Sequence, residues 1–89
     1  MNKIIFNIAT AEGKVEVAGY SIVLKGLKLC VHKQRFSPHF WSVSCYSTGY
    51  RIAEGHTIKA AIRNAGIVIQ THGSRRVQRI ALTQPIINE

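Results

Sequence analysis

Acidic residues are the scarcest feature of this 89-residue sequence. It contains four glutamates and no aspartate, against twelve lysines and arginines, which gives a formal net charge of +8. General acid–base catalysis usually employs positioned carboxylates, and the glutamates are scattered along the chain, so the sequence indicates a protein that is not an enzyme. A positive field of this size attracts polyanions such as nucleic acid or a nucleoprotein complex.

Cysteines and long apolar runs are also scarce. Two cysteines, Cys30 and Cys45, do not make a disulfide framework, and we expect free thiols. No apolar run approaches the roughly 20 residues of a membrane span, and the N-terminal ten residues lack the long apolar stretch and cleavage site of a signal peptide. We therefore expect a cytoplasmic protein with no membrane partner, located in the host cytoplasm if the chain is phage-encoded.

The sequence has no internal repeat, linker or low-complexity segment, and its length suits one domain. We expect a single domain over residues 1–89, with a core unit at 27–83 and a tail at 84–89. Apolar residues make up 46% of the chain, which is typical of a globular protein.

Residues 40–53 predict a β-hairpin. Trp41, Val43 and Cys45 alternate with polar residues, which is the period of a strand with one buried face. Turn residues follow at 47–49, and residues 50–53 form the predicted partner strand.

The segment after this hairpin predicts an α-helix. Thr57 is a suitable N-cap, because its hydroxyl can accept from free backbone N–H groups. Gly66 could end the helix and leave a strand at 67–70, whereas Gly73 is placed as the C-terminal cap of a longer helix, which we favour. An apolar stripe at helical spacing would pack on the hairpin; it consists of Ile58, Ala61, Ile62, Ala65 and Ile69.

Other segments predict strands. They are residues 3–9, a segment at 15–24 that Gly19 bends or interrupts with a bulge, residues 27–35, and a last strand at 75–83. We therefore predict an α+β fold, an antiparallel β-sheet of four to six strands in meander order with one α-helix packed on one face.

The basic residues fall into three groups, and few acids are interspersed with them. A solvated surface that only keeps the protein soluble is the alternative explanation, but the scarcity of acids favours binding of a polyanion. Phe36, Phe40 and Tyr46 are the aromatic side chains that could stack on bases, and Trp41 is expected in the core. The candidate nucleic-acid or partner-binding residues are Lys25, Lys28, Lys33 and Arg35 in and before one strand, Lys59 and Arg63 on the outer face of the helix, and Arg75, Arg76 and Arg79 near the C-terminus.

Chemistry at the cysteines and histidines is a weaker hypothesis. Cys30 with His32, or Cys45 with another histidine, offers a nucleophile and a base, but no carboxylate orients them, and Cys45 is better described as a small buried apolar residue. Cys30, His32, His39 and Cys45 offer zinc ligands, but their spacing matches no zinc-binding pattern. We therefore assign no catalytic residue, no metal site and no cofactor. Glu54 is interpreted as a charge favourable to the N-terminus of the helix.

Residues 41–66 carry two resemblances. The pattern Trp41-Ser42-Val43, then Gly55-His56-Thr57-Ile58-Lys59-Ala60-Ala61 and Ala65-Gly66, resembles the hairpin and helix of double-stranded-RNA-binding domains. This resemblance implies that Lys59 takes the place of a lysine that grips phosphates across the RNA major groove. The same pattern is similar to HicB-type antitoxin modules, which bind a small basic toxin, although a chain of charge +8 would repel such a toxin.

In style the chain also resembles small accessory proteins of phages and prophages, including anti-CRISPR proteins. This resemblance implies a non-catalytic binding protein whose basic face engages nucleic acid or a nucleoprotein complex. The alternative is a protein-directed inhibitor of a bacterial defence system, which would dock its basic face on an acidic protein surface. Apolar strand residues such as 4–6 could also pair at a sheet edge, so we expect that a homodimer can form.

Overall fold

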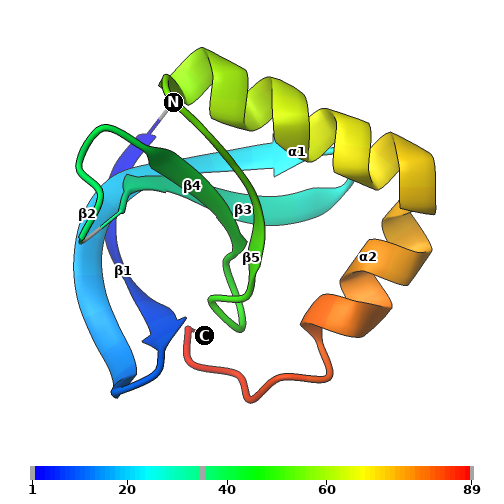
Figure 1. The fold of residues 1–89 in the computed structure, drawn as a ribbon. Coiled ribbons are helices and arrows are strands. Elements are labelled where there is room, and N and C mark those ends of the chain that lie inside the picture. The colour runs from blue at the N-terminus through cyan, green and yellow to red at the C-terminus, as the bar shows by residue number, and fades with distance from the viewer. Residues whose placement is uncertain (1, 35, 89) are drawn as a thin grey trace.

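The computed structural model describes residues 2–34 and 36–88. A five-stranded antiparallel sheet with the order β1-β2-β3-β4-β5 is followed by two helices (Figure 1). The predicted α+β fold, a meander sheet with a helix packed on it, is confirmed. The elements are β1 (Asn2–Thr10), β2 (Gly13–Leu24), β3 (Leu27–Lys33), β4 (Trp41–Cys45), β5 (Arg51–Gly55), α1 (Ile58–His72) and α2 (Ser74–Ala81).

The first core lies between the sheet and the helices. Leu29, Val31 and Val43 project from β3 and β4 and are at most 1% exposed, and they pack with Ala61, Ala65 and Ile69 of α1. The predicted stripe of α1 therefore packs on the hairpin as expected. Gly55 allows close packing, because a Cβ at this position would lie 2.6 Å from the backbone nitrogen of Ala61.

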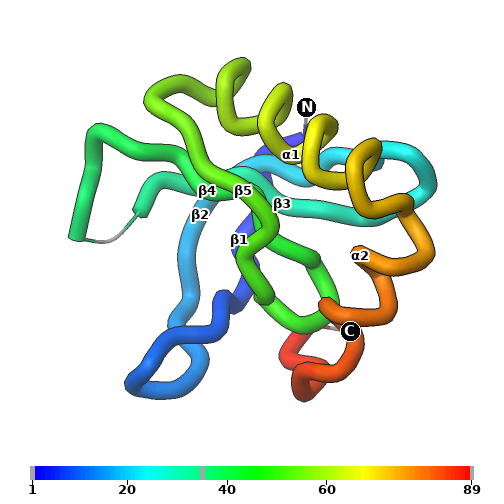
Figure 2. The backbone as a smooth tube through the Cα atoms, turned by 45° about the vertical axis from the view of Figure 1, so that its right-hand side comes forward, coloured from blue at the N-terminus to red at the C-terminus, as the bar shows by residue number. Residues whose placement is uncertain are grey.

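The long strand β2 changes partner along its length. Residues 13–21 pair with β1, and residues 20–24 pair with β3. A Cβ at Gly19 would lie 2.2 Å from the carbonyl oxygen of Val31 and 3.1 Å from Cβ of His32. Only glycine permits this approach. At the predicted bend, β2 is one continuous curved strand that comes close to its neighbour β3 (Figure 2).

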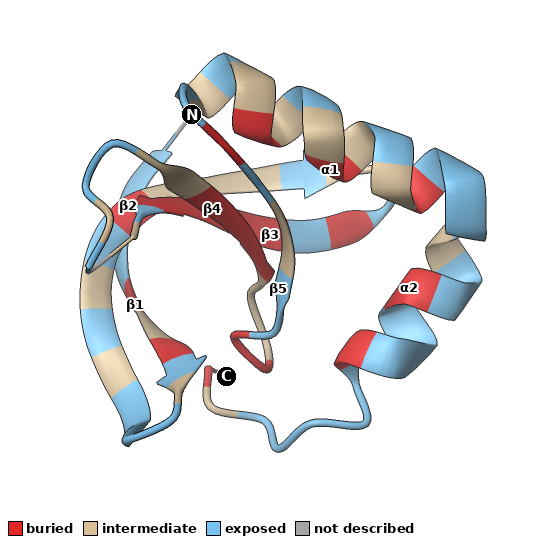
Figure 3. Ribbon diagram, in the orientation of Figure 1, coloured by how far each residue is buried: buried red, intermediate tan, exposed pale blue. Residues whose placement is uncertain are grey.

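The curvature folds the β1–β2 hairpin over the sheet face opposite α1, which we call the inner face. Phe6 and Ile8 of β1 form a second buried cluster there with Cys30 of β3. The rings of Phe6 and His32 meet edge to face with centroids 5.6 Å apart. Buried residues consequently lie on both faces of β3, whose residues 29–32 are all buried (Figure 3).

The C-terminal tail closes this arrangement. The side chain of Asn88 accepts a hydrogen bond from the backbone nitrogen of Asn7 at 2.8 Å and donates to the carbonyl oxygens of Asn7 at 2.7 Å and Tyr46 at 2.6 Å. It thereby joins β1 to the turn after β4. That turn also touches β1, since a Cβ at Gly49 would lie 2.6 Å from the nitrogen of Ala9. We call this set of contacts the clasp.

The boundaries of α1 follow the predicted caps. The hydroxyl of Thr57 accepts a hydrogen bond from the backbone nitrogen of Ala60 at 3.0 Å. Gly73 ends the helix with a φ of 80° and donates its N–H to the carbonyl of Ile69. The longer helix is thus confirmed, and the alternative strand at 67–70 does not form.

The prediction of a last strand at 75–83 is wrong, because this segment contains helix α2. Its two buried residues, Val77 and Ala81, are four positions apart. In a strand Arg79 would share their face, but Arg79 is exposed, which fits a helix. Val77 joins the core formed with α1. The fold therefore has two helices, whereas the sequence predicted only one. No helix within residues 2–34 and 36–88 has the length and apolar character needed to cross a membrane.

Asn88→Ala should lower the free energy of unfolding by about 1–3 kcal/mol, because it removes three hydrogen bonds and leaves their backbone partners unsatisfied. Urea denaturation followed by tryptophan fluorescence measures this change. Asn64→Ala is the matched control, since its amide makes an exposed hydrogen bond to the carbonyl of Glu54. Equal effects of the two substitutions would show that the clasp adds no stability of its own.

Candidate functional site

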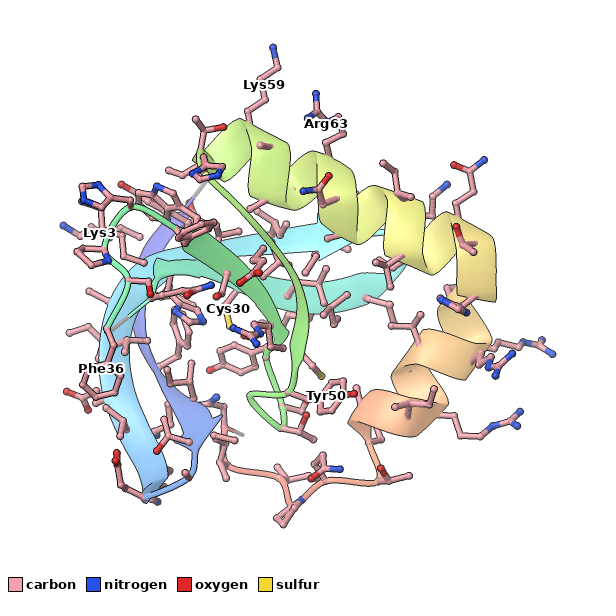
Figure 4. The ribbon with its side chains drawn as sticks, viewed as in Figure 1. Lys3, Cys30, Phe36, Tyr50, Lys59 and Arg63 are labelled. Carbon is pink, nitrogen blue, oxygen red and sulfur yellow. The ribbon has the colours of Figure 1, made fainter. Side chains whose placement is uncertain are left out.

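The helices carry two groups of basic residues, one on each helix, which together we call the helical cations. They are Lys59 and Arg63 on α1 and Arg75, Arg76 and Arg79 on α2, and all five are exposed. Lys59 and Arg63 point away from the sheet (Figure 4). Residues 55–88 contain no aspartate or glutamate, so no side-chain carboxylate from these residues lies among these cations.

The helical cations lie near the start of α1 and on α2, and residues 64–74 between the two groups contain no lysine or arginine. At about 1.5 Å of rise per residue, the distance along α1 from Lys59 to its end is roughly 20 Å. Double-stranded DNA carries one phosphate charge per roughly 1.7 Å of axis. The helical cations can therefore face several phosphates of one nucleic acid at once.

The predicted basic residues in and before β3 have individual surroundings, and two of them lie over aromatic rings. The ammonium of Lys28 lies 3.9 Å from the ring centroid of Tyr46, and that of Lys33 lies 5.5 Å from the ring centroid of Trp41. Lys25 is exposed in the turn between β2 and β3, with a φ of 50°. Arg35, the fourth member of this predicted group, lies outside the described residues.

The aromatic candidates differ in how accessible they are. Phe36 is 82% exposed in the loop between β3 and β4. Phe40 packs on His56 with ring centroids 4.3 Å apart, and Tyr46 lies beneath Lys28. Trp41, expected in the core, is half-buried, and its ring centroid lies 6.4 Å from that of Tyr20.

A polar cavity opens on the inner face, and the sequence reasoning missed it. This inner cavity has a volume of about 260 Å³. Ser42 and Ser44 of β4 look in sequence like the outward side of a half-exposed strand, but both are only 2% exposed. Polar residues at alternating positions of two neighbouring strands are the signal that could have located it. Its polar lining includes His32, Gln34, Ser42, Ser44 and Arg51, together with Thr10 at the end of β1 and Ser37 beside Phe36.

His32 has a defined hydrogen-bonding state in this cavity. Its Nδ1 lies 3.1 Å from the carbonyl oxygen of Lys33, and its Nε2 lies 3.1 Å from Oγ of Ser44. A carbonyl can only accept, so Nδ1 carries the proton and Nε2 accepts from the hydroxyl of Ser44. Burial lowers the pKa of His32, the hydrogen bond to Lys33 opposes this, and the charge of Arg51 adds to it. The imidazole is therefore neutral near pH 7.

The two cysteines are free thiols, as predicted, but their burial differs from the prediction. Cys30 is the fully buried one, whereas Cys45 is half-buried on the opposite face of the sheet. Desolvation, together with Cys45, raises the pKa of Cys30 to about 12. Its thiol donates to the carbonyl of Ser44 at 3.5 Å. The nitrogen Nε2 of His32 accepts from the hydroxyl of Ser44, so Cys30 and His32 do not act together as a thiol nucleophile with a general base.

Glu54 and the candidate zinc ligands have partners or positions that differ from a catalytic or metal site. The carboxylate of Glu54 accepts a hydrogen bond from Gln34 at 2.5 Å and pairs with Arg51 at 3.5 Å. Its partners therefore lie just after β3 and on β5, and not at the helix N-terminus. Within the described part of the chain, no three His, Cys, Asp or Glu side chains come together in a way that could hold a metal ion.

A second hollow, which we call the α2 groove, lies between β5 and the helices, with a volume of about 240 Å³. Val68, Val77 and Ile80 supply apolar lining, and Tyr50 lies beside them. Arg51, His72 and Arg76 add basic side chains. Arg51 lines both the α2 groove and the inner cavity.

Comparison of the chain with protein-family models, curated proteins and solved structures gives no match.

His32 should make the stability of the protein depend on pH. Its pKa is lowered from the ordinary 6.5, so below this pH the unfolded chain binds a proton that the folded chain excludes. The free energy of unfolding should therefore fall as the pH decreases from about 7.5 to 5.5.

Urea denaturation at several pH values measures this dependence. His32→Asn should flatten it, whereas His39→Asn, at an exposed position, should leave it unchanged. The same slope in both variants would exclude His32 as the group responsible.

Proposed function

We propose that the protein is a non-catalytic binding protein whose basic face engages nucleic acid, free or within a nucleoprotein complex. The observation that carries this proposal is the absence of any acidic residue from 55–88, where five exposed cations share one helical layer. A surface needed only for solubility would mix both signs of charge. The helical cations instead provide a field of one sign, which attracts the phosphate backbone.

The helical cations are the primary contact in this proposal, for a physical reason. Arginine guanidinium groups form paired hydrogen bonds with phosphate oxygens, and three of the five helical cations are the arginines of α2. Lys28 and Lys33 lie over aromatic rings and would have to reorient to contact a backbone fully. Lys25, Lys28 and Lys33 remain predicted secondary contacts.

A second candidate function is supported by the α2 groove. Ile80, which lines this groove, is 44% exposed, and Ile67 on α1 and Leu82 just after α2 are 54% and 46% exposed. Apolar and arginine side chains together are typical of protein interfaces. The protein would then be an inhibitor that docks its basic face on an acidic protein surface of a bacterial defence system. Tight binding to such a complex without binding to free oligonucleotide would favour this candidate.

Lys59→Gln with Arg63→Gln should weaken binding to labelled DNA and RNA and make it less sensitive to salt. Fluorescence anisotropy at several salt concentrations measures both effects. Each phosphate contact contributes about 0.7 to the slope of log K against log salt for a single strand, so loss of two contacts should make the slope shallower by about 1.4.

Lys3→Gln with Lys14→Gln is the matched control, because it removes the same charge from exposed positions on β1 and β2. If both double variants lose affinity equally, binding follows net charge alone and the helical layer is not the contact surface.

A further inference from the structure

The inner cavity is a built site with an enclosed polar floor. His32, Ser42 and Ser44 form this floor and are 4%, 2% and 2% exposed. Every fully enclosed side-chain nitrogen and oxygen in the described part of the chain has a hydrogen-bond partner. The hydroxyl of Ser44 is committed to Nε2 of His32, and Ser42 lines the cavity beside it.

The floor is polar but carries no charge. The proton of His32 is on Nδ1, bonded to the carbonyl of Lys33, and burial disfavours a second proton because it lowers the pKa of this imidazole. An anion would find no cation among these three floor residues, since the cation Arg51 lies at the rim and faces Glu54. A neutral group that both donates and accepts hydrogen bonds fits this floor better.

The rim adds one donor group and one acceptor. Gln34 donates through Nε2 to Glu54 at 2.5 Å, and its Oε1 remains an acceptor. Arg51 contacts the same carboxylate through Nη1 at 3.5 Å, and its other N–H groups remain donors. Glu54 thus holds both rim side chains in place and offsets part of the charge of Arg51.

Most of the remaining lining is apolar and suits a flat ring, and Thr10 and Ser37 are its polar members. Ile8, Ala9 and Gly49 line the cavity beside the polar floor, and Phe36 lines it from the loop after β3. Phe36 extends outward at the margin of the sheet in Figure 4, and its ring is 82% exposed. A cavity of about 260 Å³ is below the roughly 300–1,000 Å³ of sites for drug-sized ligands, so one ring system fits.

We propose that the inner cavity binds one unpaired nucleobase of a single-stranded nucleic acid, with the floor and rim reading its hydrogen-bonding edge and the apolar walls contacting its faces. Bases within a duplex cannot enter such a pocket without leaving the stack. This inference rests on the proposed function and narrows it to strands with an accessible base.

Arg51 connects this cavity to the helical cations. It lines both the inner cavity and the α2 groove, where Arg76 and His72 also lie. A strand with one base in the cavity can therefore pass its phosphates over Arg51 toward Arg76. The base and the backbone of a single ligand are then served by adjoining surfaces of the protein.

The test compares two oligonucleotides of equal length and charge, a deoxythymidine octamer and the same octamer without bases. Fluorescence anisotropy at physiological salt should show about tenfold or greater weakening without the bases, in line with loss of stacking and edge contacts. Equal affinity for both oligonucleotides would overturn the nucleobase proposal while leaving backbone binding intact. No binding of either would count against the proposed function.

Variants place the effect at the cavity. Phe36→Ala, at an exposed position, and Ser42→Ala should each reduce the preference for the base-containing octamer several-fold. Ser21→Ala on β2 is the control, because Ser21 is not part of the cavity lining. An unchanged preference in Phe36→Ala and Ser42→Ala would place the bases elsewhere and overturn the proposal.

Uncharged nucleosides test the cavity independently of the helical cations. In NMR titrations at millimolar concentration, thymidine or uridine should shift the resonances of Ser42, Ser44 and His32 selectively. Shifts in these residues would support the cavity even if octamers bound weakly, whereas none of the common nucleosides shifting them would overturn the nucleobase proposal.

Discussion

The contact between the two ends of the curled sheet is the constraint on which the other features depend. Asn88 binds both backbone groups of Asn7 and the carbonyl of Tyr46, and Gly49 lets the turn after β4 lie against β1. An antiparallel sheet of five strands has two free edges, and here the tail occupies one of them at Asn7. This closure fastens the β1–β2 hairpin, whose Phe6 and Ile8 cover Cys30 on the inner face.

Closure also explains how a small domain can bury polar side chains. Residues on the inner face of a flat sheet would be half-solvated, and serine or histidine there would need no particular partner. Because β1 covers β3, His32 and Ser44 must satisfy each other and the backbone, as they do. Although the chain has twelve basic residues, the polar side chains buried on the inner face are neutral. A buried charge without a partner would be costly.

The sequence predicts what depends on local pattern and misses what depends on long-range packing. Alternation at Trp41, Val43 and Cys45 predicts β4, and Thr57 and Gly73 predict both ends of α1. Helix α2 was missed because the partial alternation of apolar residues in 75–83 suggested a strand. The burial of Val77 and Ala81 on one helical face becomes evident only once the core of α1 is present. The bonds of Asn88 to Asn7 span 81 positions, and no local signal marks them.

The two candidate sites differ in the same way, because the helical cations could be predicted from local sequence and the inner cavity could not. Exposed cations can be predicted from charge alone, because a long basic side chain in a small domain has to remain near water. The inner cavity cannot, because Ser42 and Ser44 acquire their role only when β1 encloses them. If both surfaces act on one strand, charge supplies affinity through phosphates that carry no sequence information. Selectivity would then come from the uncharged floor of the inner cavity, where a wrong hydrogen-bonding edge leaves buried groups unpaired. Arg51, which borders both surfaces, is the residue through which the two contributions would be coupled.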